Sequence, residues 1–96
     1  MALTTQIGVG SWYGGKFSGR LTKSGEPFNP NSLTAAHRDF PMGSHVKVTN
    51  LHNDRTVVVR INDYGPARHD RIIDLSYKAA EILHIDGLAK VKLELL

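Results

Sequence analysis

The chain has 96 residues, which is enough for one domain with a hydrophobic core and too few for two. Its composition, 41% hydrophobic and 22% charged, is ordinary for a globular protein and excludes wholesale disorder. The net charge of +3 is a mild excess, and the basic residues form no run, so we expect no nucleic-acid partner. The absence of cysteine excludes disulfides and thiol catalysis.

The first residues do not have the pattern of a targeting segment. Residues 1–7 lack the basic start and the apolar run of a signal peptide. No stretch approaches the roughly 20 apolar residues of a membrane helix, so we expect no membrane insertion. We expect residues 1–6 to form an N-terminal tail and residues 7–96 to form one domain. Such a chain either stays inside the cell or is a mature or shortened form of an exported protein.

The first half of the chain predicts short strands around a long loop. Residues 7–13 alternate in side-chain character, and the two glycines among them permit a close approach of another backbone. Residues 14–30 are rich in Gly, Ser, Asn and Pro and predict a loop, which at this length is usually functional or disordered. A brief strand is expected at residues 33–36, followed by a turn at residues 41–43.

The middle of the chain carries the clearest strand signal. We expect Val46, Val48 and Leu51 to form the inward face of one strand. Residues 52–55 predict a hairpin turn, because Asn and Asp tolerate turn geometry. Residues 56–61 are β-branched nearly throughout and predict a strand that the turn-forming residues after it break sharply.

The last third predicts a strand, a helix and a strand. Ile72 and Ile73 predict a short strand that ends at Asp74 and Leu75. Ser76 is suited to be the N-cap of a helix of about two turns from Tyr77 to near Leu83, and Gly87 lies where a helix stop is expected. Residues 89–95 alternate as a half-buried strand does. Several strands with one helix predict a mainly β fold, a small closed or nearly closed barrel.

Three acidic residues on loops and strand ends are candidates for chemistry. Asp63 follows the strongest strand, Glu26 lies in the long loop, and Asp74 ends a short strand. Closure of a barrel would bring such strand ends to one rim, where neighbouring carboxyl groups raise the pKa of one of them and suit it to general acid catalysis. The alternatives stay open: Asp63 as a turn-former, Asp74 as a helix-capping residue, and Glu26 as a solvated charge.

The histidines do not form a metal-binding pattern. No two of the five histidines show the spacing of a helical metal site, and there is no cysteine to join them. Phosphate loops, dinucleotide fingerprints and the nucleophile elbow of serine hydrolases are also absent. We therefore predict no metal and no cofactor.

Motifs over nearly the whole chain carry a resemblance to a known family. In order, they are Gly8-Val-Gly-Ser-Trp-Tyr-Gly14, Ser24-Gly-Glu-Pro-Phe28, Leu33-Thr-Ala-Ala-His-Arg38, Val46-Lys-Val-Thr-Asn50, Val58-Val-Arg-Ile-Asn-Asp63 with Gly65-Pro66, and Arg71-Ile-Ile-Asp-Leu-Ser76. Together they resemble the double-psi β-barrel domain of the rare lipoprotein A family. The resemblance implies a six-stranded double-psi β-barrel with one or two short helices and a substrate groove across one side.

The resemblance also implies a function and a site. It implies an endolytic lytic transglycosylase of the bacterial cell envelope or periplasm, which cleaves peptidoglycan between N-acetylmuramic acid and N-acetylglucosamine, prefers peptide-free glycan strands and leaves 1,6-anhydro ends. Carried over by motif, Asp63 is the principal catalytic acid, with Glu26 and His37 as its partners. The positions that match substrate-binding residues are Ser11, Tyr13, Asn62, Tyr64 and Asp74.

Three departures from the family pattern bear on the substrate more than on the chemistry. Tyr64 stands where arginine is common, Pro27 follows Glu26, and Asp70 stands where glycine is usual. We expect a monomer whose partner is the peptidoglycan glycan strand. The alternative function is a non-catalytic, expansin-like domain that binds and loosens cell-wall polysaccharide.

Overall fold

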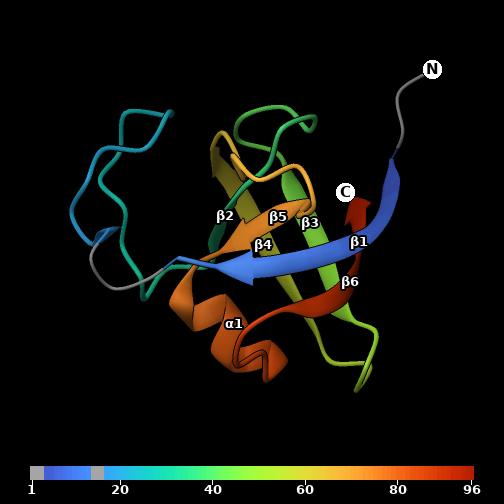
Figure 1. Ribbon diagram of the computed structural model, residues 1–96. Coiled ribbons are helices and arrows are strands. Elements are labelled where there is room, and N and C mark those ends of the chain that lie inside the picture. The colour runs from blue at the N-terminus through green and yellow to red at the C-terminus, as the bar shows by residue number, and fades with distance from the viewer. Residues whose placement is uncertain (1–3, 14–16) are drawn as a thin grey trace.

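The protein is a six-stranded β-barrel with one helix. The computed structural model describes residues 4–13 and 17–96, so residues 1–3 of the predicted tail and residues 14–16 at the start of the predicted loop lie outside the described residues. The elements are β1 (Thr5–Trp12), β2 (Thr34–Ala36), β3 (His45–Asn50), β4 (Thr56–Asp63), β5 (Ile73–Leu75), α1 (Tyr77–Leu83) and β6 (Ala89–Leu95). In Figure 1 the strands surround a common interior, and α1 lies below them.

The strand order explains how distant segments meet. The strands close a barrel in the order β1-β5-β2-β4-β3-β6. β1 pairs with β5 in parallel and β2 pairs with β4 in parallel, whereas the other pairings are antiparallel. Each parallel pair needs a crossing connection, since a tight turn joins only antiparallel strands. These connections follow β1 and β4, and this is the double-psi barrel that the resemblance implied.

The core consists of the alternate side chains that point into the barrel. Val46, Val48, Val91 and Leu93 are fully buried, which confirms the inward faces expected for their strands, and Ile61 of β4 is fully buried as well. Burial of each such side chain contributes about 1.5–3 kcal/mol relative to its exposure. The exception is Leu51, which was expected to point inward but is 38% exposed, because β3 ends at Asn50 and Leu51 already belongs to the turn.

Glycines let β1 lie close to its neighbours, as the sequence predicted. A Cβ added at Gly8 would lie 2.9 Å from Ile72 Cγ2. One added at Gly10 would lie 3.1 Å from both Ile73 Cγ2 and Val91 Cγ2. β1 begins two residues earlier than expected, because Thr5 and Gln6 still pair with β6.

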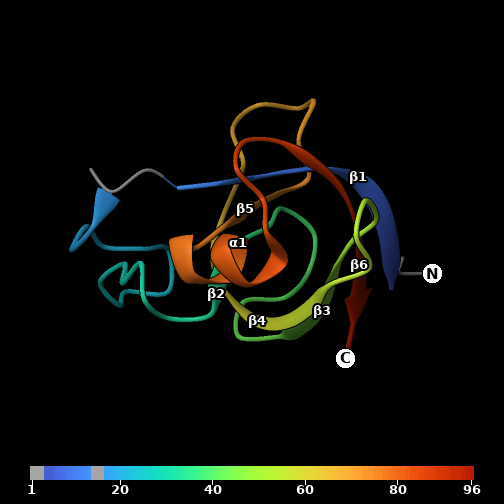
Figure 2. The same cartoon turned by 90° about the horizontal axis from the view of Figure 1, so that it is seen from below.

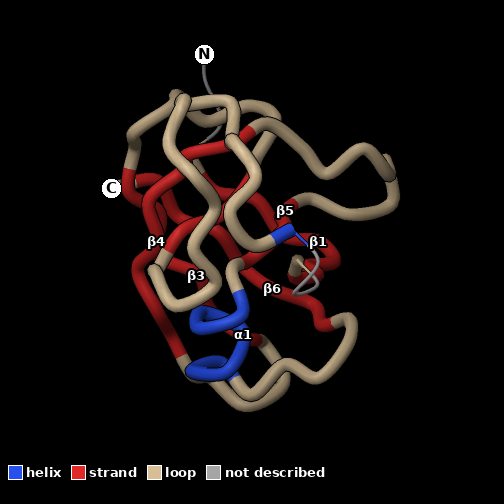
Figure 3. The backbone as a smooth tube through the Cα atoms, turned by 90° about the vertical axis from the view of Figure 1, so that its left-hand side faces the viewer, coloured by secondary structure: helices blue, strands red, loops and turns tan. Residues whose placement is uncertain are grey.

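The helix covers one end of the barrel and leaves the other end to loops. Figure 2, viewed from below, shows α1 in front of the barrel interior, and Figure 3 shows loops gathered at the opposite end.

The ends of α1 are capped by Ser76 and His84. The Ser76 hydroxyl accepts a hydrogen bond from Ala79 N–H, as predicted for an N-cap. Gly87 does not end the helix. His84 is the C-cap, in the left-handed conformation with φ of 55°, and its N–H donates to the last turn.

Candidate functional site

Asp63 lies at the end of β4, where the strand pairing is irregular. Ala35 pairs with Ile61 and Ala36 with Asp63, so that Asn62 is an extra residue in a β-bulge. Bulges re-aim side chains at strand ends and often lie next to active sites. β4 therefore continues two residues beyond the predicted strand, and Asp63 belongs to the sheet itself. The interpretation of Asp63 as a mere turn-former is thereby weakened.

Three hydrogen-bond donors converge on the Asp63 carboxylate. Its Oδ1 accepts from the backbone N–H groups of Lys23 and Tyr64, both at 2.9 Å. Its Oδ2 accepts from the Tyr13 hydroxyl at 2.9 Å. The donors come from β4's own turn, from the long loop and from the end of β1. The carboxylate is therefore held in one orientation by segments that are far apart in the sequence.

Asp63 opens into a cleft that it shares with a second carboxylate. The cleft has a volume of about 330 Å³. Its lining residues come from the ends of the strands, from the long loop and from the turn after β4: Tyr13, Asp63, Asp74, Phe17, Arg20, Leu21, Thr22, Phe28, Tyr64, Gly65, Pro66 and Ala67. Two carboxylates, aromatic rings and one arginine suit a polar ligand with flat apolar faces, such as a sugar.

Asp74 and Tyr13 are fixed within this cleft. The buried Ser11 hydroxyl donates a hydrogen bond to Asp74 Oδ1. The N-cap of α1 is Ser76, so Asp74 is not the helix cap that one interpretation of the sequence proposed. The Tyr13 ring packs on Phe28 at 4.7 Å between ring centroids. Burial, the hydrogen bond to Asp63 and the Asp63 charge raise the pKa of Tyr13 above its usual range. Tyr13 therefore keeps its proton and remains a donor to Asp63.

Glu26 lies in a separate small hollow beside the cleft. Its Oε1 accepts from Asn62 Nδ2 at 2.8 Å and forms an ion pair with Arg60 at 2.7 Å. These two partners, with the Asn62 hydrogen bond first, lower the pKa of Glu26, so it is a carboxylate near neutral pH. The hollow holds about 50 Å³, and neither Asp63 nor Asp74 lines it. Glu26 is thus a paired carboxylate, although its side chain remains 39% exposed.

His37 is buried and is not part of the cleft lining. The residue is 3% exposed, and its ring stacks on Phe40 with 4.2 Å between centroids. Its Nδ1 lies 2.8 Å from the Ile72 carbonyl oxygen. Desolvation lowers the pKa of His37, although the hydrogen bond to Ile72 opposes that effect. His37 is therefore a neutral ring near neutral pH.

The remaining predicted positions divide between the cleft and its support. Tyr64 lines the cleft and is 64% exposed, so its ring is accessible to a ligand. Asn62 is 2% exposed and holds Glu26 instead of facing the cleft. The structure thus brings Tyr13, Tyr64 and Asp74 to the cleft of Asp63. Ser11 and Asn62 do not line the cleft; Ser11 donates a hydrogen bond to Asp74, and Asn62 donates one to Glu26.

Some contributors were not singled out from the sequence. Arg60 holds Glu26, and its position two residues before Asn62 on one strand was a usable signal, since such residues share a face. Phe28 packs on Tyr13 from the long loop, and only its place in the Ser24–Phe28 motif marked it. The backbone N–H of Lys23 could not have been found from residue type, because any residue carries that donor.

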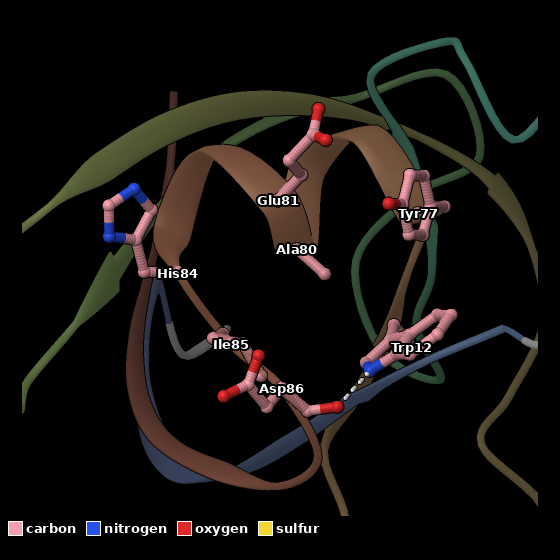
Figure 4. A pocket seen from close by; sticks show the side chains of 7 residues that line it. All are labelled: Trp12, Tyr77, Ala80, Glu81, His84, Ile85 and Asp86. Carbon is pink, nitrogen blue, oxygen red and sulfur yellow. Dashed lines mark hydrogen bonds between the residues drawn. The ribbon is translucent and has the colours of Figure 1, made fainter.

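Two further hollows lie at the helix end of the barrel. The one in Figure 4, about 370 Å³, is lined by Trp12 and Tyr77 together with residues of α1 and the turn after it. The Trp12 indole N–H donates to the Asp86 carbonyl oxygen at 3.0 Å. The other hollow, about 560 Å³, shares His84, Ile85 and Asp86 with the first. None of the predicted site residues lines either hollow.

Within the described part of the chain, no group of three or more His, Asp or Glu side chains is placed to hold a metal ion. Among the same residues, no helix has both the length and the apolar character needed to cross a membrane.

Comparisons with known proteins agree with this architecture. The model of a family described as Lytic transglycolase matches residues 5–93. A probable endolytic peptidoglycan transglycosylase RlpA of Synechocystis sp. is 54% identical over 92% of this chain and 28% of the relative. An endolytic peptidoglycan transglycosylase RlpA of Rickettsia bellii is 52% identical over 96% of this chain and 43% of the relative. The chain thus spans less than half the length of these relatives.

Among solved structures, an expansin of Clavibacter michiganensis has a TM-score of 0.72 at 18% sequence identity. That match covers 96% of this chain and 50% of the expansin chain. At this identity the likeness concerns the fold alone.

Proposed function

Because this chain belongs to the lytic transglycolase family, we propose that it cleaves the β-1,4 bond between N-acetylmuramic acid and N-acetylglucosamine in peptidoglycan. The observation that supports this most is the cleft in which the fixed Asp63 carboxyl group lies with Asp74 and two tyrosines. Peptidoglycan also implies that the protein works in the cell envelope. Peptide-free glycan strands are the preferred substrate in this proposal.

Asp63 is the catalytic residue of the proposed reaction. In its protonated form it donates a proton to the glycosidic oxygen as the bond to C1 of N-acetylmuramic acid breaks through an oxocarbenium-like transition state. The 6-hydroxyl of the same sugar then attacks C1 and returns a proton to the Asp63 carboxylate. The products are a 1,6-anhydro end and a free 4-hydroxyl on the leaving sugar. Because the nucleophile belongs to the substrate, no water-activating carboxylate is needed.

The other side chains of the cleft position the sugar and the acid. Tyr13 donates to Asp63 and fixes the direction of its second oxygen. Tyr64 offers an exposed ring for a sugar face, and Asp74 offers a carboxylate for sugar hydroxyls. Arg20 lines the cleft and can pair with the lactyl carboxylate of a peptide-free muramic acid. Glu26, which is bound to Arg60 and Asn62, supports the loop that supplies Lys23 N–H to Asp63.

Product analysis tests this function. We expect mass spectrometry of digested peptide-free glycan strands to show 1,6-anhydro-ended fragments, and Asp63→Asn to lower their release by about a thousandfold or more. Glu81→Gln is the matched control: it replaces an exposed carboxylate on α1, paired with Lys78 at 3.2 Å, and should keep full activity.

The other outcomes separate the alternatives. Reducing ends in place of anhydro ends would make the protein a hydrolase. Binding of the strands with no release of fragments would favour the expansin-like alternative and contradict the proposed cleavage.

A further inference from the structure

We propose that His37 and Arg38 act together as a staple that holds the connection between β4 and β5, residues 64–72, as one wall of the Asp63 cleft. The inference rests on the proposed function for its effect on catalysis but not for its structural basis. It assigns His37 a positioning role, where the family resemblance implied a partner in the chemistry.

The two residues bind both ends and the middle of this connection. The His37 backbone N–H donates to the Asp63 carbonyl oxygen at 3.1 Å, just before the connection begins. The His37 ring binds the Ile72 carbonyl oxygen at 2.8 Å, where the connection ends.

Arg38 binds the connection between those two points. Its guanidinium donates to the carbonyl oxygens of Pro66 at 2.5 Å, Arg68 at 3.4 Å and Arg71 at 2.7 Å. Five hydrogen bonds from two adjacent residues thus span the whole connection.

The wall of the cleft depends on this connection. Tyr64, Gly65, Pro66 and Ala67 all line the cleft. Residues 67–70 are exposed and form no strand or helix, so little else from the barrel fixes them. A planar guanidinium with several donors is suited to hold several carbonyl groups at once, which a lysine cannot do. We therefore expect loss of Arg38 to loosen the sugar-binding wall while Asp63 keeps its donors from Tyr13 and Lys23.

The His37 ring has the protonation that a holding role needs. A carbonyl oxygen only accepts, so Nδ1 carries the ring proton and donates it to Ile72. Nε2 then carries a lone pair, and it is buried with no hydrogen-bond partner in the described part of the protein. Because the residue is 3% exposed and does not line the cleft, Nε2 is not placed to exchange a proton with a bound sugar.

Amide hydrogen exchange tests the staple without reference to activity. In Arg38→Met we expect exchange of residues 64–72 to quicken about tenfold or more, while β3 and β4 exchange as in the wild type. In Arg38→Lys, which keeps the charge and one donor group, the exchange rate of residues 64–72 should lie between those of the wild type and Arg38→Met. Arg55→Met is the matched control: Arg55 also donates to a backbone carbonyl, that of Ile82 at 2.8 Å, but it directly precedes β4, at the opposite end of that strand from Asp63. Unchanged exchange of residues 64–72 in Arg38→Met would overturn the proposal.

Kinetics separate positioning from a loss of folded protein. A loosened wall raises the KM for glycan strands, by about tenfold, and leaves the pH profile of kcat unchanged. A merely unfolded fraction would lower the apparent kcat and leave KM unchanged, which would contradict the staple. If the wild type releases no anhydro fragments, the proposed function fails, and hydrogen exchange alone decides the staple.

Two substitutions of His37 separate its nitrogen atoms. Asn places an amide donor near the position of Nδ1, whereas Gln places its amide near Nε2. We expect His37→Asn to keep the wild-type exchange rates of residues 64–72 and most of the activity. In His37→Gln we expect faster exchange of residues 64–72 and lower activity. Equal losses of activity in the two variants, with normal exchange in His37→Asn, would show that the ring acts through proton transfer and would overturn the positioning role.

Discussion

His37 and Glu26 lie in opposite environments, although the motifs grouped both with Asp63. Glu26 is half-exposed and bound by Asn62 and Arg60, which stabilise its charged form. His37 is enclosed and stacked on Phe40, and desolvation stabilises its neutral form. At neutral pH the two side chains thus have fixed and different charge states.

The lowered pKa of His37 predicts a pH dependence of stability. Because burial places the folded pKa below the unfolded value of 6.5, the neutral ring stabilises the fold above that value, and this contribution is lost as the pH falls through the folded pKa. We expect the free energy of unfolding to fall less between about pH 7 and pH 5 in His37→Asn than in the wild type. Urea titrations at several pH values measure this change in the free energy of unfolding.

The control for this titration is an exposed histidine. His69→Asn replaces a side chain on the connection after β4 and should keep the wild-type dependence on pH. Identical pH dependence in His37→Asn and the wild type would show that His37 does not carry the effect.

At the scale of elements, the ends of the strands determine which side chains reach the cleft. The bulge at Asn62 turns the end of β4 so that Asn62 holds Glu26 while Asp63 faces the cleft. The crossing connections then bring the long loop and the connection after β4 to the same oxygen, Oδ1, of the Asp63 carboxylate. The chemistry thus depends on where strands end, which is the feature that sequence patterns define least well.

Ser76 joins two elements, and its loss should be measurable. Its hydroxyl accepts from Ala79 N–H at 3.3 Å and donates to the Ser32 carbonyl oxygen at 2.5 Å. Because the residue is fully buried, Ser76→Ala leaves both groups without a partner, and we expect a loss of about 1–2 kcal/mol in the free energy of unfolding. Ser18→Ala, at an exposed position, should cost less than about 0.5 kcal/mol in the same urea titration. Equal effects would contradict the capping role.

At the scale of the molecule, closure of the barrel holds the site together. β1 pairs with both β5 and β6, so the first and last strands complete the ring. The buried residues that fill the ring run from Ala35 to Leu93, and Trp12 of β1 packs against them. Residues as far apart as Tyr13 and Asp63 can therefore form one hydrogen bond in a domain with one core.

A cavity in this core should destabilise the whole barrel. Leu93 is fully buried, and we expect Leu93→Ala to cost about 2–5 kcal/mol, because it removes apolar contacts and leaves a void. Leu88→Ala, at a position 58% exposed, is the control and should cost less than about 1 kcal/mol. Thermal or urea unfolding measures both. A small loss for Leu93→Ala would mean that the β6 core position tolerates a void.

The sequence by itself determined the local elements and the family. Residue alternation, the Ser76 cap and the glycines of β1 act between near neighbours, so their physics is visible in the order of residues. The motifs likewise placed Asp63, Tyr13, Tyr64 and Asp74 among the candidates, and these line one cleft.

Only the tertiary structure decided which candidates face the cleft and which support it. Glu26 binds Arg60 across 34 positions of sequence (60 minus 26), and His37 binds Ile72 across 35. Such pairings depend on strand register and on the bulge at Asn62, where one extra residue changes the direction of the next side chain. Register is fixed by closure of the whole barrel, a collective property that no local stretch of residues contains.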